Sequence, residues 1–284
     1  MILLFKYLIK NVMSLNRPIW KLRDWIDVEI LHWIFLSYNK NAIDLIKANP
    51  EKNNWCVLSN NKNAIEMLEN NMENINWDLL SLNENAIHLL EANQEKINWD
   101  NLSENSNAIH LLEVNPEKIN WYYLSKNENA IDLLIKNPEK INWDNLSKNG
   151  NAIELLIKNP DKINWDNLSL NKNAIELLKA NPDKINWFNL SKNENAIQLL
   201  EENPEKINWC NLSRNPNAID LLKENIDNIY WFSLSMNPSI FELDYEKMKA
   251  NNQEMYEDLI KEVMKPSRVF KNPDYDYLEE LFGD

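Results

Sequence analysis

Glycine is almost absent from this sequence, and cysteine is equally rare. The 284 residues include two glycines, Gly150 and Gly283, so a glycine-rich phosphate-binding loop is excluded. The two cysteines, Cys56 and Cys210, lie 154 residues apart and fit a reduced, cytosol-like compartment better than a disulfide framework. We therefore expect neither disulfides nor a cofactor.

Two further features are missing, an excess of basic residues and a long apolar run. The net charge is −14, with about +2 in residues 1–32, −10 in 33–238 and −6 in 239–284. Duplex nucleic acid requires a basic stripe that displaces counterions, so it is not an expected partner. The opening MILLFKYLIKNVM is interrupted by Lys6 and Lys10 and is too short to span a bilayer. We interpret it as an amphipathic helix, with contact to a membrane surface as the weaker alternative, and expect no secretion.

Tryptophan, by contrast, is abundant and periodic. Ten of the 12 tryptophans recur every 22 residues without insertion: Trp33, Trp55, Trp77, Trp99, Trp121, Trp143, Trp165, Trp187, Trp209 and Trp231. With Trp as position 1, the unit reads W-x-x-L-S-x-N-x-N-A-I-x-L-L-x-x-N-P-E-K-I-N, and nine units, 33–230, are complete. Self-similarity at a fixed period of this length indicates a repeat architecture.

Each unit carries signals for two helices. Ala, Ile, Leu and Leu at positions 10, 11, 13 and 14 form an apolar stripe, with Asn at position 7 as the N-terminal cap. Asn at position 17 predicts the end of this helix, because asparagine tolerates the left-handed conformation that glycine would otherwise supply. Asn at position 22 caps a shorter helix with Trp at position 1 and Leu at position 4.

These units predict an all-α fold, an α-solenoid of nine to ten helical-hairpin repeats. At roughly 9–10 Å per layer it would form a rod of about 90 Å, in which Cys56 and Cys210 lie too far apart to pair. A leucine-rich-repeat horseshoe has a similar period but requires alternating leucines, which are missing. We expect residues 1–32 to form N-terminal amphipathic and capping helices, 33–238 the solenoid, and 239–284 a C-terminal cap with an acidic, aromatic tail.

The unit LSKNENAIDLLIKNPEKINW resembles the tandem 22-residue repeats of proteins from giant DNA viruses of the mimivirus kind. The lead-in WKLRDWIDVEILHWIFLSYNKNAI and the closing NPSIFELDYEKMKANNQEMYEDLIKEVMKPSRVF, with its K-P-S-R element at Lys265–Arg268, are similar to the flanks of such arrays. The resemblance covers residues 20–284. It implies a viral origin and no assigned catalytic residues.

Residue types that could support catalysis or metal binding recur in register, which indicates a structural role. Serine occupies position 5 in all ten units, and we expect its hydroxyl to bond local backbone. His88 and His110 occupy position 12, a face that is acidic in most units, and a layer spacing of roughly 10 Å is too large for a shared zinc ion. We interpret the Asn ladder as helix caps and the Trp ladder as core. No catalytic, cofactor or metal site is predicted, and the chain is not expected to be an enzyme.

Positions 2 and 3 are the informative ones, because they vary. The standard residues there are Asp and Asn, but several units carry apolar side chains instead: Ile34, Phe35, Tyr122, Tyr123, Phe188 and Phe232. We assign Ile34, Phe35 and Phe232 to burial under the terminal caps. Tyr122, Tyr123 and Phe188 remain as candidate contacts for a protein partner.

Two functions are compatible with these features. The first is a non-enzymatic repeat scaffold that mediates protein–protein interaction, as a viral protein in the cytoplasm of the infected host cell. The alternative is a structural component of the virion, in which the rod itself is the product. Neither a small-molecule substrate nor a membrane is an expected partner.

Overall fold

The computed structural model describes residues 18–263, which fall into two compact units. One unit consists of residues 22–241 and contains all ten repeats, and the other contains residues 18–21 and 242–263. The predicted N-terminal amphipathic helix and the acidic, aromatic tail lie outside the described residues.

Every complete repeat contributes two short helices, joined by three-residue 3-10 turns in most units. The Trp helices, which begin at position 1, are α2 (Trp33–Tyr38), α4 (Trp55–Leu58), α6 (Trp77–Leu80), α8 (Trp99–Glu104), α10 (Trp121–Leu124), α12 (Trp143–Leu146), α14 (Trp165–Leu168), α16 (Trp187–Leu190), α18 (Trp209–Leu212) and α20 (Trp231–Leu234). The Ile–Leu helices, which begin at position 11, are α3 (Ile43–Lys47), α5 (Ile65–Glu69), α7 (Ile87–Ala92), α9 (Ile109–Glu113), α11 (Ile131–Lys136), α13 (Ile153–Ile157), α15 (Ile175–Lys179), α17 (Ile197–Glu201) and α19 (Ile219–Glu224). The predicted all-α repeat solenoid is confirmed.

The core of each layer consists of the aliphatic positions 4, 10 and 14. Leu146, Ala152 and Leu156 of the sixth unit are fully buried, and the corresponding residues of the other complete units are buried as well. The tryptophans are only half-buried, so their assignment to the core is too strong. In seven units the lysine at position 20 lies over the exposed face of the ring, as Lys162 Nζ does at 4.5 Å from the centre of Trp143.

Asparagine caps the helices as predicted at two positions but ends them by a different mechanism. Asn142 Oδ1 accepts from the backbone of Asn145 at 2.9 Å, and Asn149 Oδ1 accepts from Asn151 at 3.0 Å. At position 17, Asn159 has φ −131° and its Nδ2 donates to the carbonyl of Leu155 at 2.8 Å. The prediction of a left-handed residue is therefore wrong, since residues 18–263 contain none with positive φ. The side-chain amide instead satisfies a carbonyl in the last turn of the helix.

Successive layers are joined by side chains that bond the backbone of the preceding layer. Asn171 at position 7 donates through Nδ2 to the carbonyls of Ser147 at 3.1 Å and Asn149 at 2.8 Å. Ser147 Oγ donates to Trp143 O at 2.8 Å, which confirms the local role of this serine. The same oxygen accepts from the backbone N–H of Asn164 in the next layer at 3.0 Å, a bond the sequence did not predict. The repeated residues are thus those that touch the neighbouring copy.

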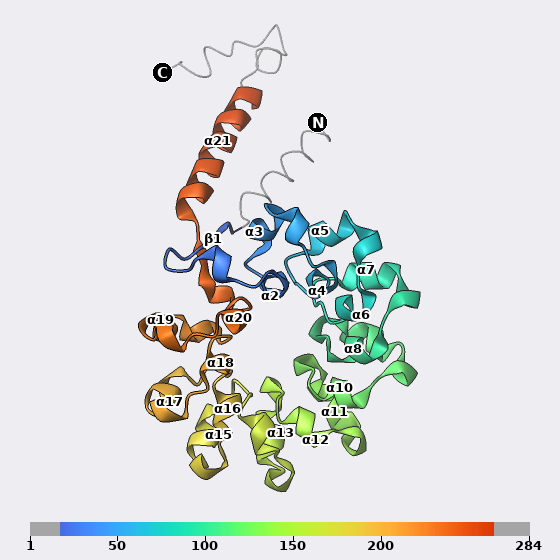
Figure 1. Ribbon diagram of the computed structural model, residues 1–284. Coiled ribbons are helices and arrows are strands. Elements are labelled where there is room, and N and C mark those ends of the chain that lie inside the picture. Colours follow the sequence, from blue (N-terminus) through green and yellow to red (C-terminus); the bar gives the residue numbers. More distant parts are fainter. Residues whose placement is uncertain (1–17, 264–284) are drawn as a thin grey trace, which may run out of the picture. The chain divides into compact units, whose positions relative to one another are not determined.

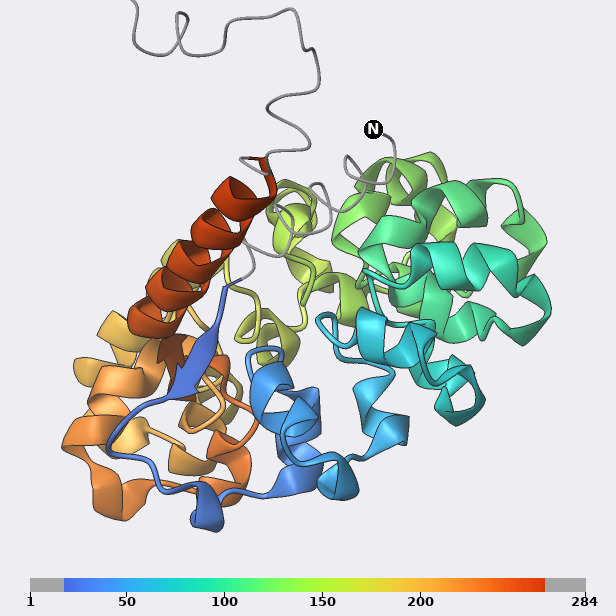
Figure 2. The same cartoon turned by 90° about the horizontal axis from the view of Figure 1, so that it is seen from above.

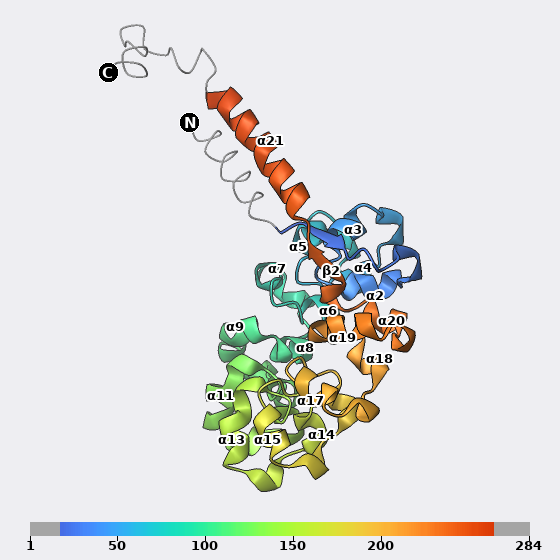
Figure 3. The ribbon, with the colours of Figure 1, turned by 90° about the vertical axis from the view of Figure 1, so that its left-hand side faces the viewer.

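The first and tenth repeats are joined in the same way, so the array is closed. Asn39 Nδ2 donates to the carbonyls of Ser235 at 3.1 Å and Asn237 at 2.8 Å, and the backbone N–H of His32 donates to Ser235 Oγ at 2.9 Å. Figures 1, 2 and 3 show the repeats passing round from α2 until α20 returns beside it. The predicted rod is therefore wrong, and residues 22–241 form a ring of ten layers. The Trp helices follow one another around the ring as one row, and the Ile–Leu helices form a second row. The second row lies outside the first along α15, α17 and α19 in Figure 1.

Aromatic side chains fill the seam between the first and tenth repeats. The rings of Phe35 and Phe232 lie 4.0 Å apart, and His32 lies 5.0 Å from the first and 4.9 Å from the second. Trp25 packs against Trp231 at 6.5 Å. Phe35 and Phe232 were expected beneath caps, but they pack on each other across the seam because the two ends are neighbours.

The second unit contains most of a two-stranded sheet and a long helix. Strands β1 (Trp20–Leu22) and β2 (Phe241–Leu243) pair, and Lys21 Nζ lies 3.2 Å from Glu242 Oε1. Helix α21 (Tyr245–Val263) runs without interruption (Figure 3). Between residues 18 and 263 we find no helix with the length and apolar character that crossing a membrane requires.

Position 8 carries a row of charges that run from layer to layer. Glu84 accepts hydrogen bonds from Lys62 Nζ and, at 2.8 Å, from Ser106 Oγ. Burial of Glu84 opposes ionisation, but these two hydrogen bonds and the charges of Lys62 and Lys172 outweigh it and lower the pKa of the carboxyl group. Glu128 lies two layers beyond Glu84 and pairs with Lys172, which lies two layers further again. Lys172 Nζ passes over Gly150, in the layer between them, and lies 3.0 Å from Glu128 Oε1.

The lowered pKa predicts a stability contribution that depends on pH. A carboxylate with a depressed pKa stabilises the fold above its unfolded-state pKa and loses that contribution as pH falls through the folded-state value. Glu84→Gln should therefore cost about 0.5 kcal/mol of unfolding free energy at neutral pH and nothing once the carboxyl group is protonated in both states. Urea titrations at neutral pH and at a pH low enough to protonate the carboxyl group measure the difference in unfolding free energy. Glu194→Gln, at the same position but without a side-chain partner in the described chain, is the control and should show no pH-dependent cost.

Candidate interaction surface

Position 2 of the Trp helices is a row of side chains that are exposed in every unit but the ninth, where Cys210 is half-buried. The position-2 row consists of Ile34, Cys56, Asp78, Asp100, Tyr122, Asp144, Asp166, Phe188, Cys210 and Phe232. Each Trp helix buries position 4 against the core, and position 2, about 200° away around a helix of 3.6 residues per turn, faces outward. Tyr122 is 53% and Phe188 56% exposed. Away from the first and tenth units, the sequence therefore presents two large rings to solvent in a row of otherwise small or acidic residues.

The backbone that carries these two rings is held by the following layer. Asn145 Nδ2 donates to the carbonyl of Tyr122 at 2.8 Å, and Asn211 Nδ2 donates to the carbonyl of Phe188 at 2.7 Å. Both asparagines are buried. Because the carbonyls are fixed from outside their own helices, the rings are displayed on a rigid support, which lowers the entropy lost when a partner binds.

Tyr123 has a different environment from the other two predicted residues. Its side chain is half-buried, and its ring meets that of Tyr122 edge to face at 5.3 Å. Lys126 Nζ lies 5.2 Å from the Tyr123 ring, and Lys192 Nζ lies 5.7 Å from that of Phe188. The structure thus brings Tyr122 and Tyr123 together in the fifth unit. It places Phe188 three layers further along, with Asp144 and Asp166 between.

The replacement of Asp by an aromatic residue also changes the next layer. Asp78, Asp100, Asp144 and Asp166 each accept a hydrogen bond of 2.8 or 2.9 Å from the position-22 asparagine that follows. After Tyr122 and Phe188 the corresponding asparagines are Asn142 and Asn208, and their Nδ2 groups have no acceptor within the part of the chain that the structure describes. Each exposed ring therefore adjoins a side-chain amide that can donate to a ligand.

Two exposed residues of the row were assigned elsewhere by sequence reasoning. Ile34 is 44% and Phe232 51% exposed, although both were expected under terminal caps. They lie on either side of the seam, where Phe232 also packs on Phe35. Closure of the ring makes Ile34 and Phe232 neighbours in the position-2 row, whereas in a linear array they would lie at its opposite ends.

The remaining candidates have structural surroundings. His88 and His110 are exposed, and their Nε2 atoms each lie 2.9 Å from Oε1 of a glutamate in the preceding layer, Glu69 and Glu91. The thiols of Cys56 and Cys210 are free. In residues 18–263 no group of three or more His, Cys, Asp or Glu side chains is arranged to hold a metal ion.

The position-2 row thus combines exposed rings with side-chain amides that have no acceptor among residues 18–263, on a backbone held by the next layer. Comparison of the chain with protein-family models, with curated proteins and with solved structures finds no match.

Proposed function

We propose that the protein is a non-enzymatic scaffold that binds a protein partner through the position-2 row. The observation that carries this proposal is that the exposed rings of Tyr122 and Phe188 adjoin the side-chain amides of Asn142 and Asn208. Neither amide has an acceptor in the described part of the chain. An aromatic ring supplies apolar contact area at a low entropic cost, and the amide can bond a backbone carbonyl of the partner. Tyr123 supports Tyr122 from the side.

Because the sequence resembles repeat proteins of giant viruses, the same proposal includes the cytoplasm of an infected host cell as the place of this activity. The alternative, a virion component whose product is an extended rod, fits the closed array less well. The first and tenth repeats bond each other through Asn39 and Ser235, and they leave no open repeat face for end-to-end growth.

The test is affinity capture of the tagged protein from infected cells, compared with the double variant Tyr122→Asp, Phe188→Asp. Aspartate is the standard residue at position 2, and both new carboxylates would meet Asn142 and Asn208 as their counterparts do elsewhere, so the variant should fold. We expect one stoichiometric partner whose affinity falls about tenfold in the variant.

The matched control is Tyr230→Asn, which removes an exposed ring at position 22, where asparagine is standard. Its partner binding should be unchanged. Capture that the double variant leaves intact would contradict the proposed surface, and capture of capsid and core proteins alone would favour the virion component.

A further inference from the structure

A second feature of the ring lies on the Ile–Leu helices, where charged side chains pair between layers. Position 15 of one repeat meets position 12 of the next. Lys47 Nζ lies 2.6 Å from Glu66 Oε2, and the Glu69–His88 pair follows the same geometry at 2.9 Å. An acidic residue at position 12 can therefore pair with a cation at position 15 of the preceding layer, as Glu66 does.

Glu154, at position 12 of the sixth unit, has no cation at position 15 of the preceding layer. The residue at position 15 of the fifth unit is Ile135, and no cation in the described part of the chain lies within ion-pair distance of the Glu154 carboxylate. Glu176, one layer on, also follows an isoleucine but pairs within its own helix with Lys179 at 3.3 Å. The residue equivalent to Lys179 for Glu154 is Ile157, so the Glu154 carboxylate is unpaired both along and across the layers.

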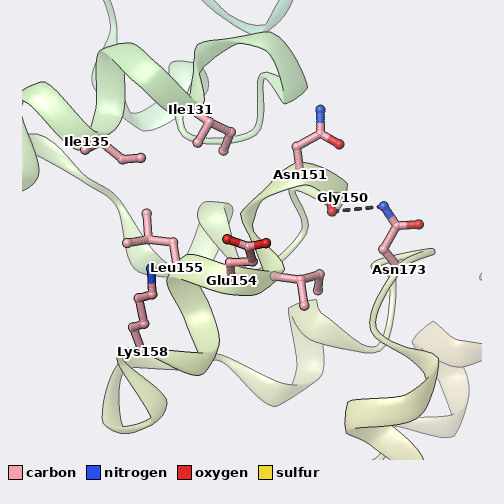
Figure 4. A pocket seen from close by; sticks show the side chains of 9 residues that line it. Ile131, Ile135, Gly150, Asn151, Glu154, Leu155, Lys158 and Asn173 are labelled. Carbon is pink, nitrogen blue, oxygen red and sulfur yellow. Dashed lines mark hydrogen bonds between the residues drawn. The ribbon is translucent and has the colours of Figure 1, made fainter.

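A groove of about 420 Å³ opens beside this carboxylate, between α11 and α13 (Figure 4). Ile131 and Ile135 form one wall, and Leu155 lies opposite, beside Glu154. Gly150 lies at one end, where its carbonyl accepts from Asn173 Nδ2 at 3.0 Å. A Cβ at this position would approach the side chains of Glu128, Lys172 and Asn173 to 3.1–3.3 Å, so a side chain here would disturb the Glu128–Lys172 ion pair that covers this end of the groove.

We propose that this groove binds an arginine or lysine side chain of a polypeptide partner. The hydrocarbon stem of such a side chain matches the wall of Ile131, Ile135 and Leu155, and its cation replaces the one that the repeat itself lacks beside Glu154. Apolar residues that flank the cation in the partner would cover the exposed side chains of Ile135 and Ile157, which are 55% and 57% exposed. This site is separate from the position-2 row and does not depend on it.

Besides Glu154, Lys158 is the one charged residue among those that line the groove. It lies one helical turn after Glu154 but forms no ion pair with it in the described structure. The complementarity of the groove therefore rests on the Glu154 carboxylate, and a guanidinium group fits it best because it can engage both carboxylate oxygens at once.

The test compares two tripeptides, acetyl-Leu-Arg-Leu-amide and its neutral isostere acetyl-Leu-citrulline-Leu-amide, by titration of the full chain with isoleucine methyl groups as NMR probes. We expect saturable shifts at Ile131 and Ile135 and about tenfold tighter binding of the arginine peptide. Glu154→Gln should reduce that ratio to one. Glu176→Gln, the same change at the same position one layer on, should leave it at about ten.

A third variant tests the missing partner directly. Ile135→Lys introduces at position 15 the lysine that the first and seventh units carry there, as Lys47 and Lys179. The new lysine should pair with Glu154 and abolish arginine binding. Equal affinity of the two peptides for the unaltered protein, or no shift at the groove, would overturn the proposal. Retention of the arginine preference in Glu154→Gln would do so as well. None of these results bears on Tyr122 and Phe188, so the two surfaces fail or succeed independently.

Discussion

Replacement of Asn39 by alanine should lower the free energy of unfolding by about 3 kcal/mol, as much as the same change at Asn171 in the middle of the array. Both asparagines are buried, and both donate to two carbonyls of the preceding layer at 3.1 and 2.8 Å. The loss of either amide leaves one carbonyl, that of Ser235 or Ser147, without a donor in the described chain, and it leaves a second carbonyl, that of Asn237 or Asn149, with its backbone donor alone. The equality of the two costs follows only if the ring is closed.

An open array predicts a different result for the same pair of variants. The Asn39 amide would then face solvent at the first layer, and its removal would cost a few tenths of a kcal/mol at most, within the range of ordinary surface substitutions. Denaturant titration of Asn39→Ala and Asn171→Ala under identical conditions measures both values. A small cost at Asn39 beside a large cost at Asn171 would contradict closure of the ring.

The local structure could be predicted from the sequence because it depends on residues close together in the chain. The stripe at positions 10, 11, 13 and 14, the caps at positions 7 and 22 and the local bond of the serine all follow from spacing within one unit. The end of the Ile–Leu helix was predicted at the right residue for the wrong reason. Spacing identifies Asn159 as a stop but does not show whether its backbone or its side chain satisfies Leu155 O.

Closure of the array could not be predicted, because it is the sum of many small rotations. Each layer turns by one tenth of a circle relative to the last, and this rotation depends on side-chain packing between layers. No single unit reveals it. The residues at the seam could have provided a hint, since His32 and Phe35 precede the array's first core leucine and Phe232 precedes its last, but their partnership requires the closed geometry.

The candidate sites differ in how far the sequence reveals them. Tyr122 and Phe188 are visible as departures from the repeat, and the structure shows both exposed. Asn142, Asn208 and Glu154 match the standard unit and do not stand out. Each becomes notable because the residue that it would meet in another layer has changed, and the sequence alone does not show which positions meet.

Closure of the ring also predicts uniform protection of the backbone against hydrogen exchange. Leu36, Leu146 and Leu234 occupy position 4 of the first, sixth and tenth units, and each donates its amide to the position-22 carbonyl of its own Trp helix at 2.8–2.9 Å. Terminal repeats of an open array fray, whereas a ring has no terminal repeats. The three amides should therefore exchange at rates within about tenfold of one another.

Opening of the seam should remove this uniformity in a specific way. In Asn39→Ala the amides of Leu36 and Leu234 should exchange about 100-fold faster than that of Leu146, because a loss of about 3 kcal/mol at one interface creates two free ends. These two amides are 198 residues apart in the chain, so their joint acceleration can arise only across the seam. Asn171→Ala is the control, and it should accelerate exchange beside the seventh unit first. If Leu36 and Leu234 already exchange much faster than Leu146 in the unaltered protein, the ring is open in solution, and the position-2 row then ends at Ile34 and Phe232 and does not continue across them.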